Sequence, residues 1–262
     1  MIIKFGDLQS VLKAASGWRP GMVMDMDSVK RSGGNAPLTF WDPVDPKRNV
    51  SSALSLDQFS LFIHACREYL RSPSERFFFP RARPLMDLET IEATFRNRGT
   101  SPFVIVLERP DLVDDNLYPQ VQRSMLGLRK LLEMNDFQVL DMRCSILKEI
   151  RMVFELVSTE LPPSRLHLGP PAWTDTADHF VEKWRMAGIG QPFLVDGRWT
   201  VFAKREHREP ASLIMAKGKE AALGNDLRDL PGLRCYSGKN AYKAPNRRAF
   251  TLLLDKREAW RA

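Results

Sequence analysis

The segment from Phe40 to Val50 restricts the backbone more than any other stretch, because it holds two Asp-Pro pairs three residues apart. Each proline fixes its own φ and disfavours a helical conformation in the residue before it. Pro43 and Pro46 therefore predict a stiff, extended path through this segment. We call residues 41–50 the Asp-Pro segment.

Two cations follow the second proline, and the rigid path predicts that they lie together. Lys47 and Arg48 are adjacent, and Asn49 follows as a turn or cap former. A helix predicted to begin near Ser55 would direct its amide groups toward the same place. Two cations beside a helix start favour an anion site. The alternative is a proline-rich connector whose charges are only solvated.

Composition indicates an ordinary folded protein of two or three domains. The 262 residues are 44% hydrophobic and 27% charged. No run of about 18 apolar residues suggests a membrane span, and the first residues lack the pattern of a signal peptide, so a cytoplasmic location is predicted. Cys66, Cys144 and Cys235 form no CxxC pair, which suggests neither a disulfide framework nor a zinc site.

The positive charge is concentrated near the end of the chain. The net charge is +7, and the stretch from Arg198 onward holds 15 Lys and Arg against 7 Asp and Glu. Aromatic residues are interleaved with these cations, a pattern that favours RNA or DNA as the partner over a merely solvated basic tail.

Periodicity predicts a mixture of helices and strands. Helices are predicted at about 5–15, 56–71, 85–97, 118–134, 175–186, 210–223 and 246–260, and strands at 22–27, 103–107, 137–142 and 151–157, with a hairpin at 193–202. A flexible loop is predicted at Ser32–Asn35. The β-α-β-β order after residue 99 favours an antiparallel sheet with helices on one face, as in RRM-like or ferredoxin-like folds.

Few residues suggest catalysis. The four histidines form no HExxH pair, and P-loop, GxGxxG and GxSxG motifs are lacking. Asp25 and Asp27 on a predicted strand could hold Mg²⁺ for phosphoryl transfer. A nucleotidyltransferase also needs a Gly-Ser helix start and a third carboxylate, neither of which is evident, so a structural role is favoured. We predict no catalytic and no metal-binding residue in this chain.

Several segments nevertheless resemble one family. The stretch Lys13–Gly21 and the Asp-Pro segment are similar to the central domain of the archaeal (class I) CCA-adding enzyme, a tRNA nucleotidyltransferase. The DPxxPxxNV pattern also resembles poly(A) polymerases and oligoadenylate synthetases. Glu75–Pro80 resembles the family's EFFxP step, and His167–Trp173 resembles its HLGPP(V)W segment.

The resemblance implies an α+β protein of three parts. They are a helical central domain of the poly(A) polymerase/oligoadenylate synthetase type at 1–98, an RRM-like body at 99–165 and a basic α+β tail at 166–262. It implies tRNA as the partner, gripped at the acceptor and TψC arms, and a nucleotide contact at Arg48. The catalytic head that binds Mg²⁺ and uses ATP and CTP is expected outside this chain.

These arguments select two groups of site residues. The nucleotide-binding candidates are Lys47, Arg48 and Asn49, and the RNA-binding candidates are Arg81, Arg83, Arg198, Lys204, Arg205, Lys239, Lys243, Arg247 and Arg248. The leading hypothesis is the tRNA-binding half of a split CCA-adding enzyme, inactive until a separate head joins it. The alternatives are a stand-alone tRNA-binding protein that has lost catalysis, a fragment of a longer reading frame, or a residual enzyme using Asp25 and Asp27. Phe77–Phe79 could stack bases or form a buried hinge.

Overall fold

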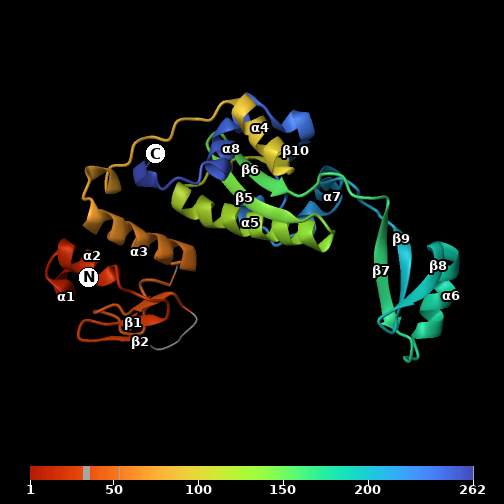
Figure 1. Ribbon diagram of the computed structural model, residues 1–262, viewed down its shortest axis with the longest axis horizontal. Helices are drawn as coiled ribbons and strands as arrows, with labels where there is room; N and C mark the ends of the chain where they lie inside the picture. The colour runs from red at the N-terminus through yellow and green to blue at the C-terminus, as the bar shows by residue number, and fades with distance from the viewer. Residues whose placement is uncertain (32–35, 53, 262) are drawn as a thin grey trace. The chain divides into compact units, whose positions relative to one another are not determined.

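A computed structural model describes residues 1–31, 36–52 and 54–261 (Figure 1). The chain divides into two compact units, one of Met1–Pro84 with Arg257–Ala262 and one of Leu85–Lys256. The division therefore falls before residue 98, where the sequence placed the first domain boundary. Among the described residues, no helix is both long and apolar enough to cross a membrane.

The first unit packs short helices against a small sheet. Its helices are α1 (Ile2–Phe5), α2 (Leu8–Ala15) and α3 (Leu56–Arg71), with 3-10 turns η1 (Glu75–Phe77) and η6 (Ala259–Arg261). The helix predicted at 5–15 is split at Gly6, whose φ is 90°. Helix α3 has the predicted bounds, because the Ser55 side chain caps it by accepting a hydrogen bond from the Gln58 amide at 3.2 Å. Trp18 and Phe59 stack in the core between these helices.

The small sheet has the order β2-β1-β3. Strand β1 (Met22–Met24) pairs antiparallel with β2 (Val29–Arg31) and parallel with β3 (Leu38–Phe40). Strand β1 ends earlier than predicted because Asp25 begins a turn. The loop predicted at Ser32–Asn35 lies outside the described residues.

The second unit contains the predicted β-α-β-β series and one further strand. Strands β4 (Ser101–Glu108), β5 (Val139–Ile146) and β6 (Glu149–Leu156) join β10 (Arg234–Ser237) in the order β10-β4-β6-β5. Every pairing is antiparallel. The fold is thus α+β, as expected from the sequence.

Helices cover both faces of this sheet, so the expectation of helices on one face is wrong. Phe103, Ile105 and Leu107 pack in the same core as helix α5 (Asp114–Met134), whereas Val104 and Val106 pack with α4 (Leu88–Arg98) and α8 (Arg247–Leu254). Because side chains alternate along a strand, both faces of β4 are buried. The sequence of a strand buried on both faces is typically a continuous run of apolar residues.

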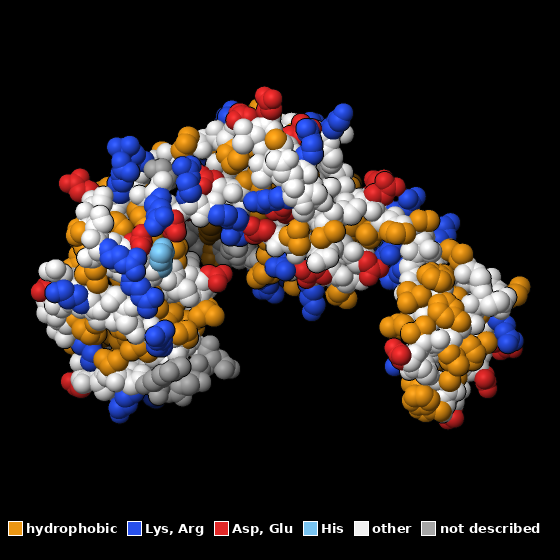
Figure 2. All heavy atoms as spheres, viewed as in Figure 1, with side chains coloured by type: hydrophobic (Ala, Val, Ile, Leu, Met, Phe, Trp, Pro, Cys, Tyr) orange, Lys and Arg blue, Asp and Glu red, His pale blue; other side chains and the backbone are white. Residues whose placement is uncertain are grey.

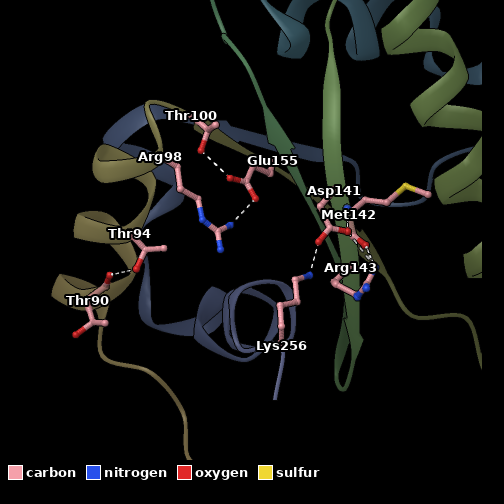
Figure 3. A network of polar contacts seen from close by, with 9 residues as sticks. All are labelled: Thr90, Thr94, Arg98, Thr100, Asp141, Met142, Arg143, Glu155 and Lys256. Atoms are coloured by element: carbon pink, nitrogen blue, oxygen red, sulfur yellow. Dashed lines mark hydrogen bonds and ion pairs between the residues drawn. The ribbon is translucent and has the colours of Figure 1, made fainter. Parts of the chain in front are cut away.

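A buried polar contact holds α4 to this sheet rather than to the first unit. Arg98 and Thr100 both reach the carboxylate of Glu155, at 2.9 and 2.7 Å (Figure 3). Glu155 is buried, so removing these partners would leave its carboxyl oxygens without hydrogen bonds away from water, at a cost in free energy. Just before α4, the Met86 amide donates to Thr251 of α8 at 3.0 Å.

The predicted tail at 166–262 consists of two different parts. Strands β7 (Ser164–Pro171), β8 (Ile189–Val195) and β9 (Arg198–Lys204) form a second sheet, order β7-β9-β8, with helix α6 (Ala177–Ala187); we call this the tail module. The chain then returns to the body through α7 (Pro210–Lys217), η2 (Gly218–Glu220), η3 (Asn225–Leu227), β10, η4 (Gly238–Ala241), η5 (Ala244–Asn246) and α8. Leu213, Ile214 and Leu227 are buried in the body core, which explains this return.

Candidate nucleotide and RNA interface

The Asp-Pro segment is a closed loop and not the extended path predicted from its prolines. Its ends meet in a bridge between Trp41 and Asn49, and the Asp42 amide donates to the Arg48 carbonyl at 2.9 Å. Both aspartates form turns, because the Asp42 side chain accepts from the Val44 amide at 2.9 Å and Asp45 accepts from Lys47 at 3.1 Å. The prolines thus stiffen a turn.

Asn49 holds the base of this loop. Its side-chain oxygen accepts hydrogen bonds from the amides of Phe40 and Ser51, both at 3.0 Å, and from the Ser51 hydroxyl at 2.8 Å. The single hydroxyl proton of Ser51 has a second acceptor within reach, the Leu38 carbonyl at 2.8 Å. Asn49, a nucleotide-binding candidate in the sequence, has its carbonyl engaged in fixing the backbone.

Lys47 and Arg48 lie on the exposed side of the loop. The Arg48 side chain is 70% exposed, and its guanidinium lies 3.9 Å from the Asp42 carboxylate. A pair this open contributes little to stability. The Arg48 guanidinium is therefore largely open to solvent, with one loose ion pair to Asp42.

An apolar groove of about 570 Å³ adjoins the loop through Val50 and Ser51. Trp18, Phe40 and Phe62 are among the aromatic side chains that line it, and Gln58 and Ser51 are its polar groups. Sequence reasoning missed this groove, because its residues come from both helices and strands.

Asp25 and Asp27 do not form a metal site. The Asp25 carboxylate accepts hydrogen bonds from the Asp27 amide at 2.8 Å and from the amide and hydroxyl of Ser28. These bonds, chiefly those from Ser28, hold the pKa of Asp25 below its usual value. Within the described ranges, no group of three or more His, Cys, Asp or Glu could hold a metal ion. The Asp25 carboxylate thus caps the turn that follows β1.

Four of the predicted RNA-binding arginines are engaged in holding the fold. Arg205 is only 10% exposed, donates to the Pro162 carbonyl at 3.1 Å and pairs with Asp136. Arg247 donates to the carbonyls of Met86 at 2.9 Å and Leu85 at 3.2 Å. Arg198 donates to the Gly169 carbonyl at 3.0 Å, and Arg83 donates to the Arg257 carbonyl at 2.6 Å. These side chains are structural as well as cationic.

The remaining candidates are exposed and belong to different parts of the chain. Arg81 belongs to the first unit and Lys204 to the tail module. Lys239, Lys243 and Arg248 lie on the body, where Lys243 sits 4.7 Å above the Tyr236 ring. Helix α4 packs beside α8 and adds Arg96, which is 72% exposed and which sequence reasoning missed. We call Arg96, Lys239, Lys243 and Arg248 the body cations.

The tail module has an apolar surface that charge counting did not reveal. Val201 and Ala203 of β9 are buried, whereas Phe202 points to the opposite face. Its ring lies 5.8 Å from that of Phe193. The exposed apolar residues of this sheet are Leu166, Leu168, Ile189, Phe193, Leu194 and Phe202, and Figure 2 shows hydrophobic side chains gathered on this module.

The predicted HLGPP(V)W segment forms strand β7 and the turn after it. His167 stacks on Phe180 of α6 at 5.7 Å, and burial lowers the pKa of its imidazole. A Cβ atom at Gly169 would lie 2.5 Å from the Phe180 ring, so a larger residue here would require that ring to shift. Trp173 ends the segment and is 77% exposed.

Two family models match the chain, one within the first structural unit and one within the second. Residues 1–79 match the model described as tRNA nucleotidyltransferase, second domain. Residues 98–232, more than half of the chain, match the model described as CCA-adding enzyme, C-terminal domain. The fold and these matches define a tRNA nucleotidyltransferase class of protein. Within that class, the chain belongs to the CCA-adding enzyme family.

Relatives in archaea agree with this assignment. The CCA-adding enzyme of Methanosarcina mazei is 35% identical over 251 residues, which cover 94% of this chain and 52% of the relative. That of Methanoregula boonei is 32% identical over 253 residues, covering 90% and 54%. That of Thermoplasma volcanium is 32% identical over 229 residues, covering 87% and 50%. The chain spans about half the length of these relatives.

Proposed function

We propose that this chain binds tRNA and contacts the incoming nucleotide during addition of CCA to tRNA 3′ ends from CTP and ATP, together with a separately supplied catalytic head. The observation that carries the proposal is the pair of family matches, to a second domain at 1–79 and to a C-terminal domain at 98–232.

Within this function, the Asp-Pro loop provides the nucleotide contact. Arg48 is exposed and has only a loose partner in Asp42, so a nucleotide phosphate can displace that carboxylate. Lys47 adds a second exposed cation beside it. Asn49 keeps the loop closed, so the two cations are presented from a fixed backbone. Phosphoryl transfer depends mainly on such positioning and on charge neutralisation.

The family's chemistry implies Mg²⁺, and the residues of this chain do not fit that ion. Both oxygens of Asp25 accept hydrogen bonds from Ser28, and no third carboxylate lies with Asp25 and Asp27 among the residues described. We therefore assign the metal to the head and no metal-dependent step to this chain.

The body cations provide the proposed tRNA contact. Lys239 and Arg248 are both exposed. Neutralising phosphates with such cations releases counterions and makes binding dependent on salt. We do not assign this role to Arg247, because its guanidinium donates hydrogen bonds to the carbonyls of Met86 and Leu85, just before α4.

Reconstitution tests the proposal. This chain is mixed with the half of the M. mazei enzyme that it does not match, tRNA lacking CCA, CTP, ATP and Mg²⁺. We expect extension only when both polypeptides are present. Extension by this chain alone would contradict the need for a head. Binding of tRNA without extension in the mixture would instead favour a stand-alone tRNA-binding protein, and failure to bind tRNA would refute the proposal.

Two sets of variants test the division of labour. Arg48→Ala should impair nucleotide incorporation in the mixture and leave tRNA affinity near that of the wild type. Lys239→Glu with Arg248→Glu should weaken tRNA binding and reduce its salt dependence by about one unit of log-log slope per lost phosphate contact. Lys30→Ala, at an exposed position of β2, is the control for loss of a cation. If Arg48→Ala and the charge reversals changed nucleotide incorporation and tRNA affinity to the same extent, the proposed separation of roles would be contradicted.

A further inference from the structure

The last residues of the chain belong to the first unit, although the preceding 172 residues form the second. The polypeptide therefore passes between the units twice, once after Pro84 and once after Lys256. Within the first unit, the Arg83 side chain donates to the Arg257 carbonyl at 2.6 Å, which joins the two passages. Residues 257–261 are called the C-terminal latch below.

An aromatic stack docks the latch. Trp260 stacks nearly parallel to Phe77, with ring centroids 5.0 Å apart and an interplanar angle of 19°. The ring of His64 on α3 lies 6.0 Å from the same indole. Stacked aromatic pairs add to the stability that their burial supplies, so Trp260 is the main anchor.

Ion pairs fix the latch along α3. Arg261 pairs with Glu68, and Glu258 lies 3.5 Å from His64. Arg261 also lies 3.5 Å from Glu258, which closes the latch on itself. The hydrogen bond from Arg261 lowers the pKa of Glu68.

Two features of the docked latch cost free energy. The Trp260 indole N–H is buried without a hydrogen-bond partner among the described residues, and a buried donor left unpaired costs free energy. A half-open pocket of about 140 Å³ also lies beside Trp260, among Cys66, Tyr69 and Phe78, so the indole is incompletely packed on this side. One aromatic stack and exposed ion pairs therefore stabilise the docked latch. The unpaired Trp260 N–H and the incomplete packing beside the indole destabilise it.

We propose that the C-terminal latch is a releasable second tether between the two units. When Trp260 is docked, two passages of the chain connect the units and restrict their relative motion. When it is released, only the passage after Pro84 remains. This inference does not depend on the proposed function, because neither tRNA nor nucleotide enters it.

The experiment measures relative motion of the units in the full chain. Dyes are attached at Lys13→Cys in α2 and Lys130→Cys in α5, both exposed positions. The native thiols label slowly, because burial raises the pKa of Cys66 to about 11 and of Cys235 to about 12, and also raises that of Cys144. Single-molecule energy transfer then gives the distribution of distances.

We expect Trp260→Ala to broaden this distribution and to speed hydrogen exchange of the latch amides by about tenfold, because exchange follows the population of the open form. Trp173→Ala, which removes an exposed tryptophan of the tail module, should change neither. A distribution for Trp260→Ala identical to that of the wild type would overturn the proposal.

A second variant shows whether the effect of Trp260→Ala comes from the lost stack and not from misfolding. Phe77→Ala removes the same stack from the other side and should reproduce the effect of Trp260→Ala, and the double variant should be no worse than either single one. Additive effects would overturn the role of the stack. In the wild-type chain, unprotected amides at 257–261 would overturn docking itself.

Discussion

Replacing Asn49 with alanine tests whether one amide side chain holds the Asp-Pro loop closed. The Asn49 oxygen accepts from two backbone amides and one hydroxyl. Two of these donors have another acceptor. The Phe40 amide also donates to the Ser51 hydroxyl oxygen at 3.0 Å, and the Leu38 carbonyl, 2.8 Å from that hydroxyl, is a second acceptor for its proton.

In Asn49→Ala only the Ser51 amide loses its hydrogen-bond partner. The cost of leaving that amide unpaired sets the expected change in the free energy of loop opening. An amide left unpaired away from water costs about 1–3 kcal/mol, and Ser51 is half-buried, so the lower part of that range applies. We expect local opening of the loop to become easier by about 1–2 kcal/mol, which is roughly a 5- to 30-fold increase in the open population.

Hydrogen exchange of the peptide covering residues 38–52 measures this change. Asn49→Ala should exchange roughly 5- to 30-fold faster there, with peptides of the second unit unchanged. Asn49→Asp is the matched control, because it keeps the accepting oxygen and should stay near the wild type. Exchange in Asn49→Ala at the wild-type rate, or equal acceleration in both variants, would refute the reasoning.

Two further predictions concern the second unit. Gly127→Ala should lower the melting temperature, at a cost of about 1–3 kcal/mol, because its Cβ would lie 2.4 Å from the Ala222 carbonyl oxygen; Arg123→Ala on the same helix is the control, and an unchanged melting temperature would contradict the argument. The hydrogen bond from Arg234 holds the pKa of Glu149 below its ordinary value of 4.5. Its stabilisation is therefore present above that value and lost as pH falls through the lower folded pKa. Denaturant titrations from about pH 6 to 3 should show a smaller acid-side loss of stability for Glu149→Gln, and equal losses would count against it.

Local sequence was enough to predict those helices and strands whose periodicity, capping residue or turn residues lie within the element itself. Helix α3 combines apolar periodicity with a capping serine, and both features lie within its own residues. The hairpin of β8 and β9 turns at Asp196 and Gly197, whose φ angles of 48° and 74° suit the Asp-Gly turn that was predicted. Such signals act over a few residues and need no distant partner.

The candidate site was predicted in part. Lys47 and Arg48 lie side by side on an exposed loop, as the sequence indicated. The closed shape of that loop was missed, because it depends on hydrogen bonds that the Asn49 side chain accepts from the amides of Phe40 in β3 and of Ser51. Likewise, Arg205 and Arg247 looked like free cations, and only the packed structure shows the carbonyls that they bind.

The sequence by itself determined the family, the α+β class and most helices, since these follow from motifs and short-range periodicity. Tertiary structure alone decided where the basic end of the chain lies. Strand β10 is four residues long and pairs with β4, from Arg234 opposite Val106 to Ser237 opposite Phe103. So short an edge strand has no periodicity of its own. Its pairing, the packing of α8 beside α4 and the docking of Trp260 on Phe77 depend on contacts between residues far apart in sequence, whose free energy no local pattern encodes.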